Sequence, residues 1–269
     1  MIKVENLNMS FGKKKILNNI SFNVKEGEIF GFLGPSGAGK TTTIKILTNQ
    51  LVPTSGTSKV SVNKEEIGIL SDTSGVYERL TVYRNLSFFA ELSKTDTKEV
   101  ERILKKVKLW DSKDQKVKNL SKGMKQRLLL ACAVIHNPKL LFLDEPTAAL
   151  DPATVEEIHK LLFDLRKNGA TIFLTTHNME EADKMCDRVA FLNKGEIVEL
   201  DTPSALKQKY SKNSIIIKFS DDKELVVPKS TEKLIKALEK NQDKTIKSIH
   251  SEEPNLAEIF LSLTGRELK

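Results

Sequence analysis

The sequence predicts an α/β protein with a mostly parallel sheet covered by helices, an antiparallel β-subdomain at its start and a small α+β extension at its end. Apolar runs such as "EIFGFL", "KLLFLDEP" and "ATIFLTTH" have the length and composition of buried strands, and segments of helical periodicity separate them. With 269 residues, of which 39% are hydrophobic, the chain can form one large domain and a smaller one.

The first part of the chain begins with an antiparallel pair of strands. "MIKVENLNMSF" and "ILNNISFNV" alternate apolar and polar residues around "GKKK", as hairpins do. The strand "EIFGFL" then leads through a glycine-rich segment to a helix over residues 40–51, with Ile44, Leu47 and Leu51 on one face and Pro53 as its stop. Short strands near residues 60–62 and 67–70 precede a helical segment over 82–107.

The second part alternates strands and helices until the pattern changes. "LSKGMKQRLLLACAVIHNP" predicts a helix ending before Pro138, and the strands "KLLFLDEP", "ATIFLTTH" and "DRVAFLNKGEIVEL" alternate with helical segments. From about Ser204 onward we expect a hairpin, a short helix, a third strand and a last helix with Asn255 as N-cap, Glu258 in its capping box and Gly265 as stop. We therefore predict a domain over residues 1–205, with a helical subdomain at about 73–135, and an extension over 206–269.

Composition limits the possible partners. The net charge of +7 is compatible with an anionic partner, but acidic residues are interleaved and neither an RNA-binding nor a helix-turn-helix motif occurs, so no nucleic acid is expected. Residues 13–15 are a short basic cluster that a turn between strands explains as well as function does. No apolar stretch reaches the ~20 residues of a membrane span and no secretory signal begins the chain, so we expect a soluble chain. Cys132 and Cys186 are expected to be buried free thiols, as in a reducing cytosol.

"GPSGAGKTT" lies between a predicted strand and a predicted helix. Glycines let the backbone wrap closely around a polyphosphate, Lys40 neutralises phosphate charge, and the Thr41 hydroxyl can ligate magnesium. A simple glycine-rich turn would leave Lys40 unexplained. The predicted nucleotide-binding residues here are Gly34, Pro35, Ser36, Gly37, Ala38, Gly39, Lys40, Thr41 and Thr42.

Two adjacent carboxylates end the strand "LLFLDEP". Burying them is costly unless a cation or the open mouth of a sheet receives them, and ligands of parallel sheets bind at this end of the strands. Asp144 is expected to hold magnesium through water, and Glu145 to polarise an attacking water as general base. The alternative is an ordinary turn with a helix cap.

Three further motifs follow in a fixed order. "LSKGMKQRLLLA" occupies residues 120–131, "AALD" occupies 148–151, and His177 follows the strand "TIFLTT". With the glycine-rich loop and the two carboxylates, this set resembles the ATPase subunit of ATP-binding cassette (ABC) transporters, over about residues 1–206. The resemblance implies a P-loop NTPase core that binds ATP and Mg²⁺.

The resemblance also assigns roles at matching positions. Ser121 and Gly123 would meet the γ-phosphate bound by the P-loop of a second copy, which implies a head-to-tail dimer around two ATP molecules. Asp151 would bridge the two sites, and His177 would contact the γ-phosphate and position the water. Phe11 would stack on adenine, although core packing explains this aromatic residue equally well.

The sequence departs from the family pattern at three places. Asp72 stands where these ATPases usually have glutamine, and its carboxylate can ligate magnesium but cannot donate an amide hydrogen bond. Lys122, Met124 and Lys125 replace three residues of the common form "LSGGQ". The stretch between the P-loop helix and Asp72 is also shorter than usual, which suggests a trimmed β-subdomain.

The form "LSKGMKQRL" and the ending "EEPNLAEIFLSLTGREL" are similar to a subfamily that pairs with separate permeases for export of drugs, peptide antibiotics or ions. This resemblance implies a permease partner and a place on the cytoplasmic face of the membrane. Tyr77 and Tyr83 are candidates for the permease contact, with core packing as the alternative. One alternative function is a soluble ABC ATPase acting on ribosomes or DNA, but the sequence shows no second cassette, long coiled coil or zinc module. The other alternative is a nucleotide-sensing interaction protein with a dead site, but Lys40, Asp144, Glu145 and His177 are all in place.

Overall fold

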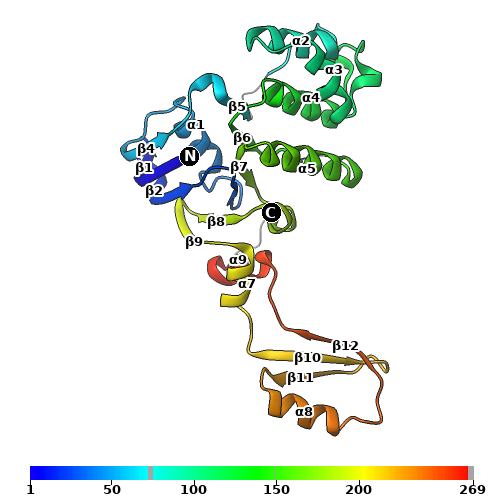
Figure 1. Ribbon diagram of the computed structural model, residues 1–269. Helices are drawn as coiled ribbons and strands as arrows, with labels where there is room; N and C mark the ends of the chain where they lie inside the picture. Colours follow the sequence, from blue (N-terminus) through cyan, green and yellow to red (C-terminus); the bar gives the residue numbers. More distant parts are fainter. Residues whose placement is uncertain (72–74, 149, 266–269) are drawn as a thin grey trace. The chain divides into compact units, whose positions relative to one another are not determined.

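We analysed a computed structural model that describes residues 1–71, 75–148 and 150–265. The chain divides into two compact units, one over residues 1–200 and one from residue 201 to the end of the described chain. Figure 1 gives the element labels used below. The larger unit contains an antiparallel sheet, a mixed sheet and a group of helices, and the smaller unit has a sheet of its own.

The central sheet of the larger unit has the strand order β5-β6-β7-β3-β8-β9. Strand β3 runs parallel to both β7 and β8, and β6 runs parallel to both β5 and β7. The prediction of a mostly parallel sheet is therefore confirmed. The strands of this sheet are β3 (Ile29–Leu33), β5 (Ile67–Leu70), β6 (Leu140–Asp144), β7 (Thr171–Thr176), β8 (Arg188–Asn193) and β9 (Glu196–Asp201).

The predicted antiparallel β-subdomain is also present. Its order is β2-β1-β4, with β1 (Ile2–Phe11) antiparallel to both β2 (Lys14–Val24) and β4 (Ser55–Val60). Phe22 of β2 packs 5.6 Å from Phe30 of β3 and 6.0 Å from Phe173 of β7, measured between ring centroids. One hydrophobic core thus joins this sheet to the central sheet and holds the strand that precedes the glycine-rich loop.

Helices connect the strands of the central sheet. Helix α1 packs on β4 and β6, α4 on β5, α5 on β7, and α6 on β3 and β7. The helices of the larger unit are α1 (Lys40–Leu47), α2 (Val82–Leu92), α3 (Lys98–Lys106), α4 (Lys122–Val134), α5 (Pro152–Lys167) and α6 (Met179–Met185), with short 3₁₀ turns η1 (Lys64–Glu66), η2 (Trp110–Ser112) and η3 (Val117–Asn119).

Two helix boundaries differ from the sequence prediction. The helix expected over 40–51 ends at Leu47, because Thr48 leaves helical geometry and Asn49 adopts a left-handed conformation with φ of 58°. The segment expected to be helical over 82–107 is two helices, broken where Lys94 takes a φ of 55°. Helices α2, α3 and α4 form a group of their own, which Figure 1 shows as a cluster of helices away from the antiparallel sheet.

The smaller unit contains the predicted strands and helices. Its sheet has the order β11-β10-β12, from β10 (Ser214–Phe219), β11 (Glu224–Pro228) and β12 (Ile246–Ser251), and α8 (Thr231–Glu239) packs against β11. Helix α9 (Leu256–Thr264) begins with the predicted capping box of Asn255 and Glu258 and ends at Gly265. The prediction overlooked α7 (Pro203–Lys209), although Thr202 as N-cap and Pro203 in the first turn are common helix-start residues.

Two expectations from composition can be compared with the structure. Among the described residues, no helix is both long and apolar enough to cross a membrane. Both cysteines are free, and Cys186 is buried while Cys132 is partly buried. Burial raises the pKa of both thiols, so they are poor nucleophiles near neutral pH.

Candidate nucleotide-binding and catalytic site

The glycine-rich loop connects the fully buried strand β3 to the first turn of α1. Gly39 is the N-cap of α1 with φ of 114°, and a Cβ there would lie 2.6 Å from Cδ2 of Leu17. Gly37 has φ of 78°, and a Cβ there would meet nothing within 4 Å, so the loop is open at this point. The left-handed backbone at both positions therefore favours glycine. The loop leaves space where a phosphate group can approach the backbone N–H groups at the helix N-terminus.

Lys40 lies at the base of this loop with only 7% of its surface exposed. Its Nζ donates to the Gly34 carbonyl at 2.6 Å and to the Pro35 carbonyl at 3.3 Å. It also lies 3.6 Å from Oε1 of Glu145, which makes an ion pair. The ammonium group is thus held inside the loop, where it can face phosphate oxygens.

Asp144 ends β6 beside the loop. Its Oδ2 accepts a hydrogen bond of 2.6 Å from the Thr41 hydroxyl, and its Oδ1 accepts one from the Thr175 hydroxyl of β7. Hard oxygen atoms of three side chains on neighbouring elements therefore meet beside the start of α1, and oxygen is the ligand type that magnesium prefers. The described residues contain no group of three or more His, Cys, Asp or Glu side chains for a metal, so this set would need phosphate and water as further ligands.

Glu145 follows Asp144 in a left-handed conformation with φ of 50°, which is uncommon for a residue other than glycine. Its N–H donates to the Thr175 carbonyl at 3.0 Å. Oε2 lies 2.9 Å from Nδ1 of His177, and Oε1 faces Lys40. The structure therefore brings together the predicted general base, the predicted histidine and the P-loop lysine.

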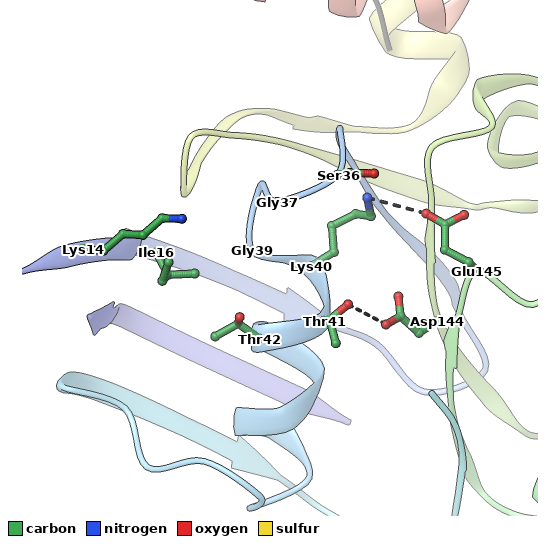
Figure 2. Close-up of a pocket in the computed structure, with 10 residues that line it drawn as sticks. All are labelled: Lys14, Ile16, Ser36, Gly37, Gly39, Lys40, Thr41, Thr42, Asp144 and Glu145. Atoms are coloured by element: carbon green, nitrogen blue, oxygen red, sulfur yellow. Dashed lines mark hydrogen bonds and ion pairs between the residues drawn. The ribbon is translucent and has the colours of Figure 1, made fainter. Parts of the chain in front are cut away.

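A cavity of about 350 Å³ is lined by the glycine-rich loop, Lys40, Thr41, Asp144 and Glu145, as Figure 2 shows. Two of its lining residues, Lys14 and Ile16 of β2, were not assigned to the site from the sequence. Lys14 belongs to the basic cluster of residues 13–15, and only the packing of β2 against the loop places it at the cavity. The cavity is lined by Lys14, Ile16, Ser36, Gly37, Gly39, Lys40, Thr41, Thr42, Asp144 and Glu145.

Phe11 lies at the end of β1, opposite Lys14 in the β1–β2 ladder. Half of its surface is exposed, so the alternative of a core aromatic residue is wrong. Its ladder partner Lys14 lines the cavity, whereas Phe11 itself is not among the lining residues, so its stacking on a base stays a prediction.

Three predicted residues occupy helix starts away from the loop. Ser121 is the N-cap of α4 and accepts a hydrogen bond of 3.2 Å from the Met124 N–H, with Gly123 in the first turn. Asp151 is the N-cap of α5, where hydrogen bonds from the hydroxyl and N–H of Thr154 hold its pKa below the usual value. Among the described residues that line the cavity, none belongs to these two helix starts. Asp72 lies outside the described residues.

The site fits a nucleoside triphosphate with magnesium. An open loop at a helix N-terminus with a buried lysine suits the phosphates, and the oxygens of Thr41 and Asp144 suit the metal. Fold and site together define a P-loop ATPase of the α/β class.

Comparisons with known proteins give the family. The ABC transporter family matches residues 17–148. A fluoroquinolones export ATP-binding protein of Mycobacterium tuberculosis is 37% identical, over 100% of this chain and 94% of its own length. The linearmycin resistance ATP-binding protein LnrL of Bacillus subtilis is 31% identical over the full length of both chains. The lantibiotic transport ATP-binding protein SrtF of Streptococcus pyogenes is 35% identical, over 74% of this chain and 89% of its own. The chain belongs to the ATP-binding subunits of ABC transporters, and it is an ATPase.

Solved structures agree with this assignment. An ATP-binding subunit of an ABC transporter superposes with a TM-score of 0.72 at 26% identity, covering 78% of this chain and 93% of the other. The dimeric bacterial ABC transporter cassette MJ0796 gives a TM-score of 0.68 at 28% identity, covering 75% and 98%. The same cassette in a post-hydrolysis state bound to ADP and Pi gives 0.66. The expected fold class is thereby confirmed.

Proposed function

We propose that this protein is the ATP-hydrolysing motor subunit of a membrane exporter and that two copies enclose two ATP molecules head to tail. The proposal of a dimer rests on one observation. The cavity holds the P-loop and the catalytic carboxylates, while Ser121 and Gly123 begin a different helix, so a single chain offers an incomplete phosphate site. The dimer of the MJ0796 cassette supports this proposal, as do the names of three relatives, which refer to fluoroquinolones export, linearmycin resistance and lantibiotic transport.

Side chains of one copy would bind the phosphates and the metal. Lys40 and the N–H groups of the loop would bind the β- and γ-phosphates, since the buried lysine and these N–H groups are donors beside the open loop. Thr41 and Asp144 would hold Mg²⁺, which supplies positive charge to the phosphate oxygens during transfer. The second copy would add the Ser121 hydroxyl and the N-terminal end of α4.

Glu145 and His177 would act on the water. Glu145 would accept the proton of the attacking water, because its carboxylate lines the cavity, is partly exposed and faces the loop lysine. His177 would orient that carboxylate through the 2.9 Å contact and would reach the γ-phosphate. Asp151, held as an anion by Thr154, would contact the facing copy.

The permease would bind the helical subdomain. Tyr77 is 51% exposed and packs edge-on against Phe88, while Leu80 and Tyr83 are 36% and 37% exposed. These side chains form an exposed apolar surface, largely aromatic, around the start of α2, and protein interfaces are enriched in such residues. The protein would thus sit at the cytoplasmic face of the membrane, bound to its permease. Residues 1–205 would form the ATPase domain, with residues 73–135 as its helical subdomain.

Glu145→Gln tests the catalytic role and the dimer together. The amide keeps the shape of the side chain but cannot take a proton, so ATP should still bind while steady-state hydrolysis falls at least about a hundredfold. Because product formation would no longer open the interface, gel filtration with saturating ATP and Mg²⁺ should detect a dimer that is missing without ATP. A variant that stays monomeric with ATP, or hydrolyses it at the wild-type rate, would contradict the proposal.

A further inference from the structure

Glu145 is held in its left-handed conformation by contacts that lie outside the nucleotide cavity. Such a backbone conformation persists only where the surroundings impose it. We propose that Gln126 and a cluster of the partly buried Thr147 with the buried His159 and Glu181 are positioning residues that fix the general base relative to His177. The inference rests on the proposed role of Glu145 in hydrolysis.

The cluster centres on one carboxylate oxygen of Glu181. Oε1 of Glu181 accepts a hydrogen bond of 2.7 Å from the Thr147 hydroxyl and lies 3.0 Å from Nε2 of His159. His159 and Glu181 are each only 4% exposed. Nδ1 of His159 and Oε2 of Glu181 are buried without a hydrogen-bond partner among the described residues.

The three residues of the cluster lie on the segments that hold the site residues Glu145, His177 and Asp151. Thr147 follows Glu145 by two residues, and the N–H of Ala148 donates to the Glu145 carbonyl at 3.2 Å. Glu181 stands in the first turn of α6, which begins just after His177. His159 belongs to α5, whose N-cap is Asp151. One buried carboxylate thus joins the elements that present the base, the histidine and the candidate bridging aspartate.

Gln126 adds a fourth element. Its side-chain Nε2 lies 3.3 Å from both the Glu145 carbonyl and the Pro146 carbonyl, and it donates from α4, the helix that Ser121 caps. On the other side, the Glu145 N–H donates to Thr175 of β7. The backbone around the general base is therefore bound from the helix side and from the sheet side.

Stability alone does not explain this arrangement. A buried carboxylate and imidazole are costly to desolvate, and apolar residues of similar volume often give an equally stable or a more stable protein. Two of the four polar side-chain atoms of the His159–Glu181 pair also lack a partner in the described part, which adds to the cost. The cluster is explained if the residues that follow Glu145 must keep a fixed position, a requirement that comes from catalysis and not from folding.

Thr147→Val removes the hydroxyl and keeps the size of the side chain. We expect kcat for ATP to fall about tenfold, because the segment after Glu145 loses its bond to Glu181, while KM for ATP changes less than about twofold since the P-loop is untouched. Thr147→Ser restores the hydroxyl and should recover most of the activity. Thr171→Val is the matched control: its hydroxyl is buried and accepts from the Gly27 N–H at the other end of β7, so kcat should stay at the wild-type value.

A second measurement reports the contact between His177 and Glu145 and does not depend on hydrolysis. The chain has four histidines, and proton NMR with single substitutions can assign them. Thr147→Val should shift the His177 ring resonance, which reports the contact with Glu145, whereas Thr171→Val should not. If Glu145→Gln hydrolyses ATP normally but Thr147→Val still shifts this resonance, the general-base role fails and the positioning role stands. A Thr147→Val protein with wild-type kcat and an unchanged His177 signal overturns the inference, as does equal impairment of the valine and serine variants.

Discussion

Lys40 shows at the residue scale how one side chain combines burial with charge. Only 7% of the surface of this residue is exposed, yet its ammonium has the Gly34 carbonyl and Glu145 as partners. A buried cation that faces an open loop is matched to an anionic ligand, since charge-assisted hydrogen bonds are about twice as strong as neutral ones.

Lys40→Ala should therefore weaken ATP binding itself. Removal of the charge that faces the phosphates is expected to raise the Kd for ATP at least about tenfold, as measured by titration calorimetry. Lys13→Ala removes an exposed lysine from the turn after β1 and serves as the control with an unchanged Kd. Equal affinities of the two variants would show that Lys40 does not contact the phosphates.

Asp72 stands where the family pattern usually has glutamine, and its role stays a prediction. If its carboxylate is a magnesium ligand, Asp72→Ala should reduce hydrolysis with a modest loss of ATP affinity. Asp72→Gln should then retain more activity than Asp72→Ala, because its amide oxygen can also ligate the metal. If it only caps a turn, Asn should replace it well and Gln poorly. Magnesium-dependent ATPase assays of the three variants decide between these orders.

At the scale of elements, α4 links structure and function through its N-cap. Ser121 stabilises the helix by accepting the Met124 N–H, and the same hydroxyl is proposed to meet a phosphate of the second copy. The first turn of α4 contains no acidic residue, which leaves its positive end open to an anion.

An aspartate at this position separates the two roles. Asp caps helices as well as Ser does, whereas Ala costs about 1 kcal/mol. Ser121→Ala should thus lower the melting temperature slightly, and Ser121→Asp should keep it while repelling the phosphate and lowering ATPase activity more than Ala does. Thr202→Asp, at the N-cap of α7, is the matched control for an added charge. Normal ATPase activity in Ser121→Asp would exclude the phosphate contact.

At the scale of the whole molecule, the complete site would require two chains. The Lys40→Ala chain lacks a working P-loop, and the Ser121→Arg chain lacks a working signature segment. A heterodimer of the two has one site in which both halves are intact. An equal mixture of the variants should recover about a quarter of the wild-type activity if dimers form at random. No recovery, in a mixture where labelled chains prove that heterodimers form, would contradict shared sites.

Local patterns in the sequence determined much of this protein. Alternating and helical periodicities located most elements, because they report which face of each segment is buried. The loop before Lys40 and the carboxylates after β6 were recognisable because their chemistry depends on neighbours in sequence. Helix α7 and the break near Lys94 were missed, since single cap and turn residues are weaker signals than periodicity.

Only the tertiary structure decided which distant residues share a site. The close approach of β2 to the loop at Gly39 brings Lys14 to the cavity, and the parallel order β6-β7-β3 brings Asp144, Thr175 and the loop together. The contacts of Gln126 with the Glu145 carbonyl, and of His159 with Glu181, join helices whose spacing in sequence carries no sign of them. Sheet order and helix packing depend on how all the apolar faces are buried at once, and no local segment contains that information.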